Sequence, residues 1–256
     1  MLTLCSRSIP GSVRTINEDS VVSDSALGLL AVADGMGGHN AGEVASRLAL
    51  EGVCGFLLKS STESDFTWPF GVDPAMSFNA NRVMTAVKFA NRSVFRASEE
   101  RAGYTGMGST LVAALFESAH FCFASVGDSR VYVATQTDIR QLSRDDSWVV
   151  MVAAERGVDA AALKKHPMRH VLTNVLGARS EIDVSVSESE LNEGETLMLC
   201  SDGLHGAVPD EMILSILRSE LDLERVADNL LETALARDGS DNISVALARY
   251  TADPAS

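Results

Sequence analysis

Short apolar runs that end at an aspartate recur along the chain. Three such runs are Leu27–Ala33 before Asp34, Phe121–Val126 before Asp128, and Thr196–Cys200 before Asp202. Apolar runs of this length, bounded by turn residues, are typical of buried strands. Val131–Val133 then predicts the return strand of a hairpin, and Ile243–Tyr250 predicts a last strand after Asp241. The pattern therefore predicts strands whose ends carry carboxylates.

Helical periodicity appears between these groups of strands. Apolar residues recur at spacings of three and four in the predicted helices, which are 41–59, 80–102 and 223–235. Because the helices come in pairs without strict alternation with strands, the pattern favours two antiparallel sheets covered by helices, an α+β fold. Residues from about 144 to 178 break the strand rhythm and predict short helical pieces in a surface insertion near the site. One domain over 1–256 is expected.

Composition narrows the function classes. The chain has 256 residues, 46% of them hydrophobic, and a net charge of −14 from 35 acidic and 21 basic residues. That charge would repel nucleic acid and anionic membranes, so neither is an expected partner. The four cysteines are widely spaced and predict reduced core residues. Neither a leader peptide nor a membrane span is apparent, which predicts a cytoplasmic protein.

The aspartates indicate a metal site only when they are considered together. A single Asp-Gly at a strand end is usually a plain turn. Several buried carboxylates close together, however, are too costly unless cations neutralise them. Asp34, Asp202 and Asp241 have no His or Cys at ligand spacing beside them. Oxygen-only ligands favour Mn²⁺ or Mg²⁺ over zinc or copper.

An arginine precedes a pair of acids near the N-terminus. Arg14 lies four residues before Glu18 and five before Asp19. An exposed charged loop would explain these residues in isolation. The planar fork of arginine also suits a phosphate group, and a carboxylate behind it can hold metal-bound water.

These motifs occur in the order found in one known family. They are Arg14 with Asn17-Glu18-Asp19; Ala33-Asp34-Gly35-Met36-Gly37-Gly38 with Ala41-Gly42-Glu43; Gly108-Ser109-Thr110-Leu111; Val126-Gly127-Asp128-Ser129-Arg130; His166-Pro167 with Leu172-Thr173 and Leu176-Gly177; Cys200-Ser201-Asp202-Gly203-Leu204; and Asp241-Asn242-Ile243. Over nearly its whole length the chain resembles the metal-dependent type 2C protein serine/threonine phosphatases in their bacterial form.

The resemblance implies a fold, a site and a reaction. The fold would be an α-β-β-α sandwich with the metals in a cleft at one end and a flap at 144–178. Asp34 would bridge two metals, Gly35 would offer its carbonyl, and Asp202 and Asp241 would complete one metal's ligands. Glu18 and Asp19 would act through water, and Asp128 would help to bind a third, weaker metal. A water bridging the two metals would then attack phosphoserine or phosphothreonine while Arg14 holds the phosphate.

The chain departs from the family at a few positions. Met36 stands where eukaryotic members have a histidine proposed as the general acid, and His39 is nearby but offset. Gly206 stands where many members have an aspartate for the third metal. In the flap, Asp145-Asp146-Ser147 replaces a common Asp-His-Ser. The flap's basic residues could attract a phosphorylated substrate or could be ordinary surface charge; they are Lys164, Lys165, Arg169 and His170.

Three functions remain open from the sequence. The first is a monomeric phosphatase acting on phosphorylated proteins and opposing a cognate serine/threonine kinase. The second is a phosphoprotein-binding regulator with weak or lost catalysis, which the intact Arg14, Asp34, Asp202 and Asp241 disfavour. The third is a small-molecule phosphohydrolase with the same metal centre, because the residues alone specify only a phosphate ester.

Overall fold

Two antiparallel sheets stack face to face in the computed structural model, which describes residues 1–38, 41–62, 67–157, 159, 163, 166–219 and 222–251. The first sheet has the strand order β1 (Leu2–Ile9), β11 (Ile243–Tyr250), β10 (Thr196–Cys200), β7 (Arg130–Ala134) and β8 (Ile139–Gln141). The second has the order β2 (Asp19–Asp24), β3 (Leu29–Met36), β5 (Leu111–Glu117), β6 (His120–Val126) and β9 (Ser185–Glu190), with β4 (Gly108–Ser109) paired to the end of β3.

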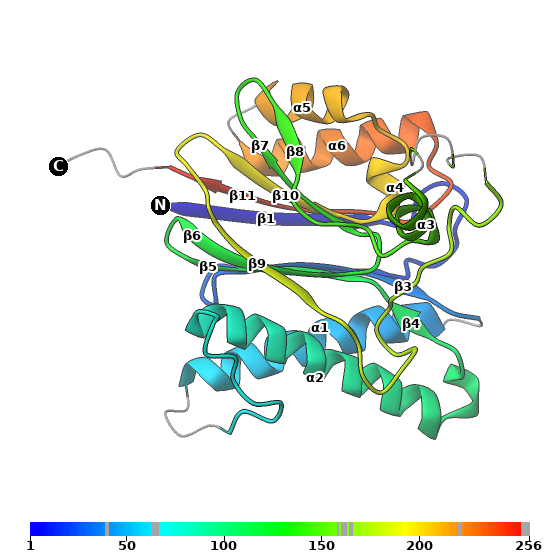
Figure 1. Ribbon diagram of the computed structural model, residues 1–256. Helices are drawn as coiled ribbons and strands as arrows, with labels where there is room; N and C mark the ends of the chain where they lie inside the picture. The colour runs from blue at the N-terminus through cyan, green and yellow to red at the C-terminus, as the bar shows by residue number, and fades with distance from the viewer. Residues whose placement is uncertain are drawn as a thin grey trace.

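Helices cover both outer faces of the two sheets (Figure 1). The second sheet carries α1 (Ala41–Thr62) and α2 (Phe78–Glu100), and a 3₁₀ turn at Ala102–Tyr104 follows α2. The first sheet carries α4 (Asp202–His205), α5 (Asp210–Ser219) and α6 (Leu223–Arg237). This arrangement confirms the α-β-β-α sandwich. No helix within the described residues is long and apolar enough to span a bilayer.

The apolar run of β3 is buried on both faces. Leu29, Ala31 and Ala33 pack with α1 and α2, whereas Leu30 and Val32 face the other sheet. Successive side chains of a strand point to opposite faces, so a strand between a helix layer and a second sheet needs apolar residues throughout. Each fully buried Leu or Val contributes about 1.5–3 kcal/mol relative to an exposed one.

The two helices on the second sheet follow the predicted periodicity. Helix α2 begins at Phe78 because the Ser77 hydroxyl accepts a hydrogen bond from the Ala80 amide at 3.1 Å. Its buried stripe includes Val83, Val87 and Val94, as the spacing predicts. Helix α1 crosses it closely, since a Cβ added at Gly52 would lie 2.8 Å from Ala90 Cα. A glycine is therefore needed where the two helices touch.

The predicted hairpin between β6 and β7 is wrong, because the two strands lie in different sheets. Strand β6 pairs with β5 and β9, and β7 pairs with β10 and β8. The turn Gly127-Asp128-Ser129 instead carries the chain from one sheet to the other, with Gly127 at a φ of +94°. A residue with a side chain adopts that backbone conformation only at a cost. Asp128 consequently lies between the two sheets at their edge.

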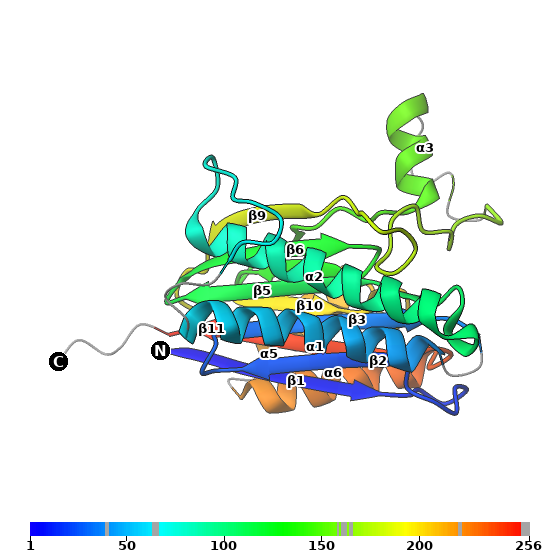
Figure 2. The same ribbon diagram turned by 90° about the horizontal axis from the view of Figure 1, so that it is seen from below.

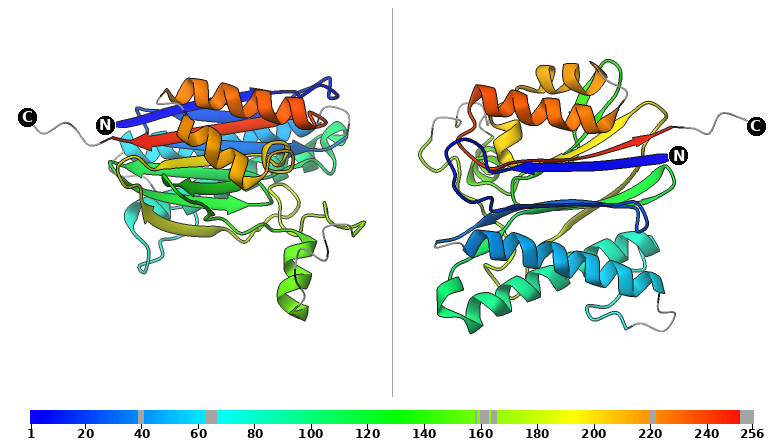
Figure 3. Two further views of the ribbon diagram at one scale, coloured as in Figure 1. Left: turned by 90° about the horizontal axis from the view of Figure 1, so that it is seen from above. Right: turned by 180° about the vertical axis from the view of Figure 1, so that it is seen from behind.

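The segment predicted as a surface insertion carries helix α3 (Trp148–Arg156), which projects from the sandwich (Figures 2 and 3). The Ser147 hydroxyl caps its first turn, and Gly157 ends it in the left-handed conformation. The Trp148 ring stacks on His166 with centroids 4.4 Å apart, so α3 is tied to the returning chain. The four cysteines are free thiols, as expected; Cys5, Cys122 and Cys200 are buried, and Cys54 is partly exposed.

Candidate metal centre

Carboxylates from five separate parts of the chain meet at the end of the sandwich opposite the start of β1 and the end of β11 (Figure 1). Asp34 lies within β3, which continues to Met36, and Asp19 opens β2 directly across from it in the strand register. Asp202 is the first residue of α4, Asp241 precedes β11, and Asp128 lies in the turn between β6 and β7. The prediction that the strand before Asp34 ends at this acid is therefore wrong, whereas the strand predicted after Asp241 has the bounds of β11. The fold nevertheless brings all five together.

Asp34 is the acid on which the charges of all four other aspartates act. Burial and then the charges of Asp19, Asp202, Asp128 and Asp241 raise the pKa of its carboxyl group well above the usual value. Its backbone is fixed, because Thr110 Oγ1 accepts from the Asp34 amide at 3.0 Å and the Thr110 amide donates to the Asp34 carbonyl at 2.8 Å. The main chain thus holds a carboxylate where charge is unfavourable unless a cation is present.

Asp202 faces Asp34 from the other sheet. Burial raises the pKa of Asp202, and the charge of Asp241 adds to the effect. The positive charges of His170 and Arg14 and a hydrogen bond with the Asp34 carboxyl group act in the opposite direction. The two carboxyl groups that were predicted to share a metal are therefore within contact of each other.

Asp19 is the most deeply buried acid of the group, with 6% of its surface exposed. Its Oδ2 accepts a hydrogen bond from the Ser201 hydroxyl at 2.8 Å, whereas its buried Oδ1 has no partner among the described residues. Burial raises the pKa of Asp19 to about 6. An unpartnered buried carboxylate oxygen is costly, and this one points to a bound cation or its water as the intended partner.

Glu18 and the Gly35 carbonyl approach each other beside the start of α1. The Gly35 amide donates to the Glu18 carbonyl at 3.1 Å. A Cβ added at Gly42 would lie 2.4 Å from Glu18 Oε1 and 2.9 Å from the Gly35 carbonyl oxygen. Gly42 therefore leaves space for these two oxygens, a role that its place in the sequence motif did not reveal.

We expect Gly42→Ala to lower the affinity of the site for a divalent metal, because the methyl group would displace the Glu18 carboxylate and the Gly35 carbonyl. Gly55→Ala is the matched control on the same helix, where a Cβ would meet none of the described residues within 4 Å. The control should keep its metal affinity and gain up to about 1 kcal/mol of helix stability. Calorimetric titration with Mn²⁺ and thermal unfolding measure both effects. Equal Mn²⁺ affinities in the two variants would contradict the prediction.

Arg14 lies at the rim of the group on the loop between β1 and β2. Its Nη2 donates to Asp241 Oδ2 at 2.9 Å, and both side chains are about half exposed. Asn242 holds this loop: its Oδ1 accepts from the Glu18 amide at 2.8 Å, and its Nδ2 donates to the Ile16 carbonyl at 3.0 Å. Exposed ion pairs contribute only about 0–1 kcal/mol, so Arg14 can exchange Asp241 for another anion at little cost.

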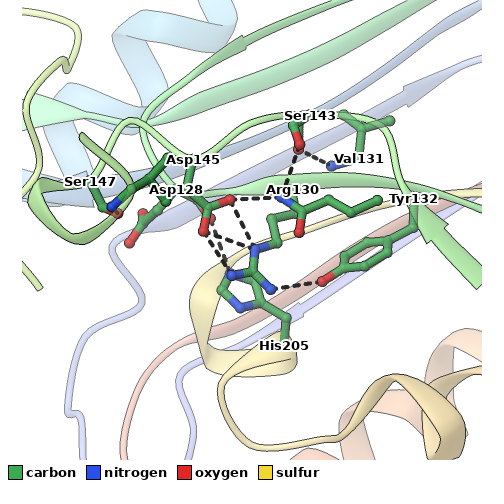
Figure 4. Close-up of polar contacts among 10 residues, drawn as sticks. Asp128, Arg130, Val131, Tyr132, Ser143, Asp145, Ser147 and His205 are labelled. Atoms are coloured by element: carbon green, nitrogen blue, oxygen red, sulfur yellow. Dashed lines mark hydrogen bonds and ion pairs between the residues drawn. The ribbon is translucent and has the colours of Figure 1, made fainter. Parts of the chain in front are cut away.

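Asp128 is positioned by a polar network that the sequence analysis missed (Figure 4). Nε2 of the partly buried His205 lies 3.0 Å from the Asp128 carbonyl oxygen, and burial lowers the pKa of His205 to about 4, so the neutral ring donates. Arg130 binds Asp145 through Nε at 3.0 Å and Nη2 at 2.7 Å, and its Nη1 donates to the Tyr132 hydroxyl at 2.9 Å. The turn is thereby tied to α4 and to the base of the predicted flap.

The electrostatics of Asp128 resemble those of Asp34. Burial and then the charges of Asp202 and Asp145 raise its pKa to about 7. Gly206 is exposed in the turn that follows α4 and brings no carboxylate towards Asp128. The weaker third metal site therefore stays a prediction.

Two further sequence predictions concern the surroundings of the site. Met36 ends β3 beside Gly108 and has no proton to give. Arg169 and His170 are exposed, and the influence of His170 on Asp202 places this part of the flap at the acidic end. His39, Lys164 and Lys165 lie outside the described residues.

The donor set fits hard divalent cations. The groups that converge here are carboxylate and carbonyl oxygens, and the buried Asp19 Oδ1 has no partner in the part of the chain that the structure describes. Among the described residues, no three His, Cys, Asp or Glu side chains would enclose a metal as they stand. Water would therefore complete the coordination, as is usual for Mg²⁺.

The fold and this centre define a two-sheet α+β protein with an acidic, oxygen-rich site at one end. The family model described as Protein phosphatase 2C matches residues 13–248. The chain belongs to this family, which consists of metal-dependent serine/threonine phosphatases, so the resemblance found in the sequence is confirmed.

Two curated relatives show the extent of the similarity. The chain is 33% identical over 248 residues to the serine/threonine protein phosphatase PstP of Mycobacterium tuberculosis, a match that covers 97% of this chain and 45% of PstP. It therefore spans less than half the length of that relative. It is 31% identical over 240 residues to the serine/threonine phosphatase stp of Listeria monocytogenes, covering 93% of this chain and 91% of that protein.

Solved structures agree with the fold. A crystal structure of M. tuberculosis PstP matches with a TM-score of 0.84 and 33% identity, covering 98% of this chain and 99% of that chain. The catalytic domain of PstP in complex with two manganese ions matches with a TM-score of 0.80 and 31% identity, again covering 98% and 99%.

Proposed function

We propose that the chain is a protein serine/threonine phosphatase that hydrolyses phosphoserine and phosphothreonine and opposes a cognate serine/threonine kinase. The observation that carries this proposal is Asp34, whose pKa is raised by burial and by four aspartates from separate elements. Such a group fits divalent cations, and Arg14 lies beside it in reach of Asp241. The similarity to PstP and stp supports the substrate class.

The proposed ligands follow from the arrangement of the oxygens. Asp34, the Gly35 carbonyl, Asp202 and Asp241 would hold two Mn²⁺ or Mg²⁺ ions. Glu18 and Asp19 would hold water next to them, and Asp128 would contribute to a third, weaker site. When bound, the ions would neutralise the carboxylates, lower the pKa of the attacking water and stabilise charge on the phosphoryl oxygens.

The protein's own groups would orient the ester and shield the charges. Arg14 would move from Asp241 to two phosphoryl oxygens, because a guanidinium binds phosphate through paired hydrogen bonds. Thr110 and Ser109 would keep Asp34 in place through its backbone amide and carbonyl. Residues 1–256 would form one catalytic domain that acts as a monomer, with the flap at 144–178 beside the cleft.

The proposal is tested by assaying a phosphothreonine peptide and p-nitrophenyl phosphate with Mn²⁺, with Mg²⁺ and with a chelator. We expect hydrolysis of both compounds with a divalent ion and none with the chelator, since without cations the phosphate would face repelling carboxylates.

The other outcomes would contradict the proposed function or favour one of the two alternative functions. Activity that resists the chelator would contradict the metal-dependent reaction. Hydrolysis of p-nitrophenyl phosphate without hydrolysis of any phosphopeptide would indicate a small-molecule phosphohydrolase. A wild type no faster than Asp34→Asn would indicate a phosphoprotein-binding regulator.

A further inference from the structure

A basic groove lies on the outer face of the molecule, between α2 and the chain segment 180–182 that leads into β9. Its cavity has a volume of about 580 Å³. One wall carries Lys88, Arg92 and Arg96 of α2, and the apolar lining comes from Phe70, Phe95 and Ile182. Figure 1 shows the loop before β9 reaching down to α2. The groove is separate from the acidic centre and has the opposite sign of charge.

The three cations of the basic groove form a stripe along α2. Their spacing of four residues places them on one face of the helix, about 6 Å apart along its axis. Arg92 and Arg96 are exposed and Lys88 is half-buried. Among the described residues, none of the three has a hydrogen-bonded or ion-pair partner, although the chain has a net charge of −14. Neighbouring like charges destabilise a helix, so this stripe needs an explanation other than folding.

The wall opposite the stripe is held rigidly by Asn91. This buried side chain donates through Nδ2 to the Arg179 carbonyl at 3.1 Å and the Ser180 carbonyl at 3.2 Å, and its Oδ1 accepts from the Gly177 amide at 2.8 Å. Gly177 packs so closely that an added Cβ would lie 2.5 Å from Val94 Cγ1. The groove is therefore preformed, which reduces the conformational entropy that the protein loses when a ligand binds.

We propose that the basic groove binds an acidic segment of a partner protein in extended conformation, with acids at alternate positions and apolar residues between or beside them. Alternate residues of an extended chain lie about 6.6 Å apart on one side, which matches the pitch of the three cations. Aromatic or aliphatic side chains of the segment would contact Phe70, Phe95 and Ile182. A nucleic acid fits less well, because its longer backbone would meet the field of a strongly acidic protein.

The basic groove also has a structural connection to the acidic centre. The segment that Asn91 holds continues back to Leu176, whose amide and carbonyl pair with Ser109 at 2.8 and 3.1 Å. The Ser109 hydroxyl in turn donates to the Asp34 carbonyl at 3.1 Å. A partner bound in the groove would consequently lie against the same segment that supports the proposed bridging ligand.

The test is a binding titration of the full chain with a fluorescein-labelled peptide that alternates Glu with Phe and Leu. We expect Arg92→Glu/Arg96→Glu to weaken binding at least tenfold, and rising salt to weaken binding to the wild type. Arg140→Glu/Arg225→Glu is the matched control: it makes the same change in net charge on β8 and α6 and should bind like the wild type. Glu181→Gln should bind more tightly, since Glu181 lines the groove.

Catalysis separates this proposal from the proposed function. Arg92→Glu/Arg96→Glu should hydrolyse p-nitrophenyl phosphate like the wild type, and peptide binding requires no turnover. Equal loss of binding in both double variants, or equal binding of a peptide with Lys in place of Glu, would overturn the proposal. So would self-association that only Arg92→Glu/Arg96→Glu abolishes, because the groove would then be an interface between two copies.

Discussion

Asp34→Asn should abolish phosphatase activity and, at the same time, stabilise the metal-free protein. Loss of a group that only orients a metal ligand costs about 10–100-fold in affinity or activity, so loss of the proposed bridging carboxylate should exceed 100-fold. The stability gain follows from the raised pKa of Asp34, which reports that its charged form is unfavourable in the fold. An amide of the same shape removes that charge and the repulsion from the surrounding aspartates.

Steady-state kinetics with Mn²⁺ and thermal unfolding with a chelator measure the two effects. Each 1 kcal/mol of added stability should raise Tm by roughly 2–4 °C for a chain of this size. Asp138→Asn is the control, because Asp138 is exposed in the turn before β8. An Asp34→Asn variant that lost both activity and stability would show that Asp34 stabilises the fold. This result would contradict the prediction that its charge destabilises the metal-free protein.

Much of this fold could be predicted because its periodicities are local. The run from Leu29 to Ala33 is apolar at every position since both faces of β3 are covered, and the stripe of α2 recurs at three and four residues. The prediction of a hairpin between β6 and β7 was wrong for a physical reason. Nothing in the residues around Gly127 shows that the strand on one side pairs in one sheet and the strand on the other side pairs in the second.

In the candidate site, too, the contacts that depend on tertiary structure could not be predicted from the sequence. The acids themselves were predicted from their types and from the resemblance, but the pairing of Asp19 with Asp34 depends on the strand register. The contact of Arg130 with Asp145 also depends on tertiary structure, because the residues lie 15 positions apart on different segments. Asn242 carried one usable signal: an amide side chain between an acid and a strand often fixes a neighbouring loop.

The stability of the metal-free protein should fall as pH rises from about 6.5 to 8. Asp128 has its pKa raised to about 7, and that of Asp34 is raised well above the usual value. The folded state therefore binds protons that the unfolded state has already released, and the stability these groups confer at low pH is lost as pH rises through their folded-state pKa values. A shift of one pKa unit corresponds to about 1.4 kcal/mol, so the loss from Asp128 amounts to several kcal/mol in total, most of it below pH 6.5 and the rest within this window.

The choice of pH window decides whether this effect can be seen. Below about pH 6.5, two groups act in opposite directions on the stability of the protein. The pKa of Asp19 is raised to about 6, so its contribution to stability falls as pH rises. The pKa of His205 is lowered to about 4, so its contribution increases as pH rises. Above the ordinary pKa of histidine the His205 contribution is constant, so among the described groups with a shifted pKa the carboxyl groups set the slope of stability against pH. Thermal unfolding in chelator at pH 6.5, 7.25 and 8 measures it, and Asp128→Asn should remove the part centred near pH 7.

Divalent cations should reverse this dependence, because they bind the ionised carboxylates and so favour the form that is costly without them. Saturation at 100 times the dissociation constant adds about 2.7 kcal/mol, and tighter binding at higher pH adds more. The rise in Tm on adding a fixed concentration of Mn²⁺ should therefore be larger at pH 8 than at pH 6.5. A metal-free stability that stays level or increases across this window would show that the clustered aspartates are not held at unfavourable charge. The aspartates would then need no cation to offset their charge.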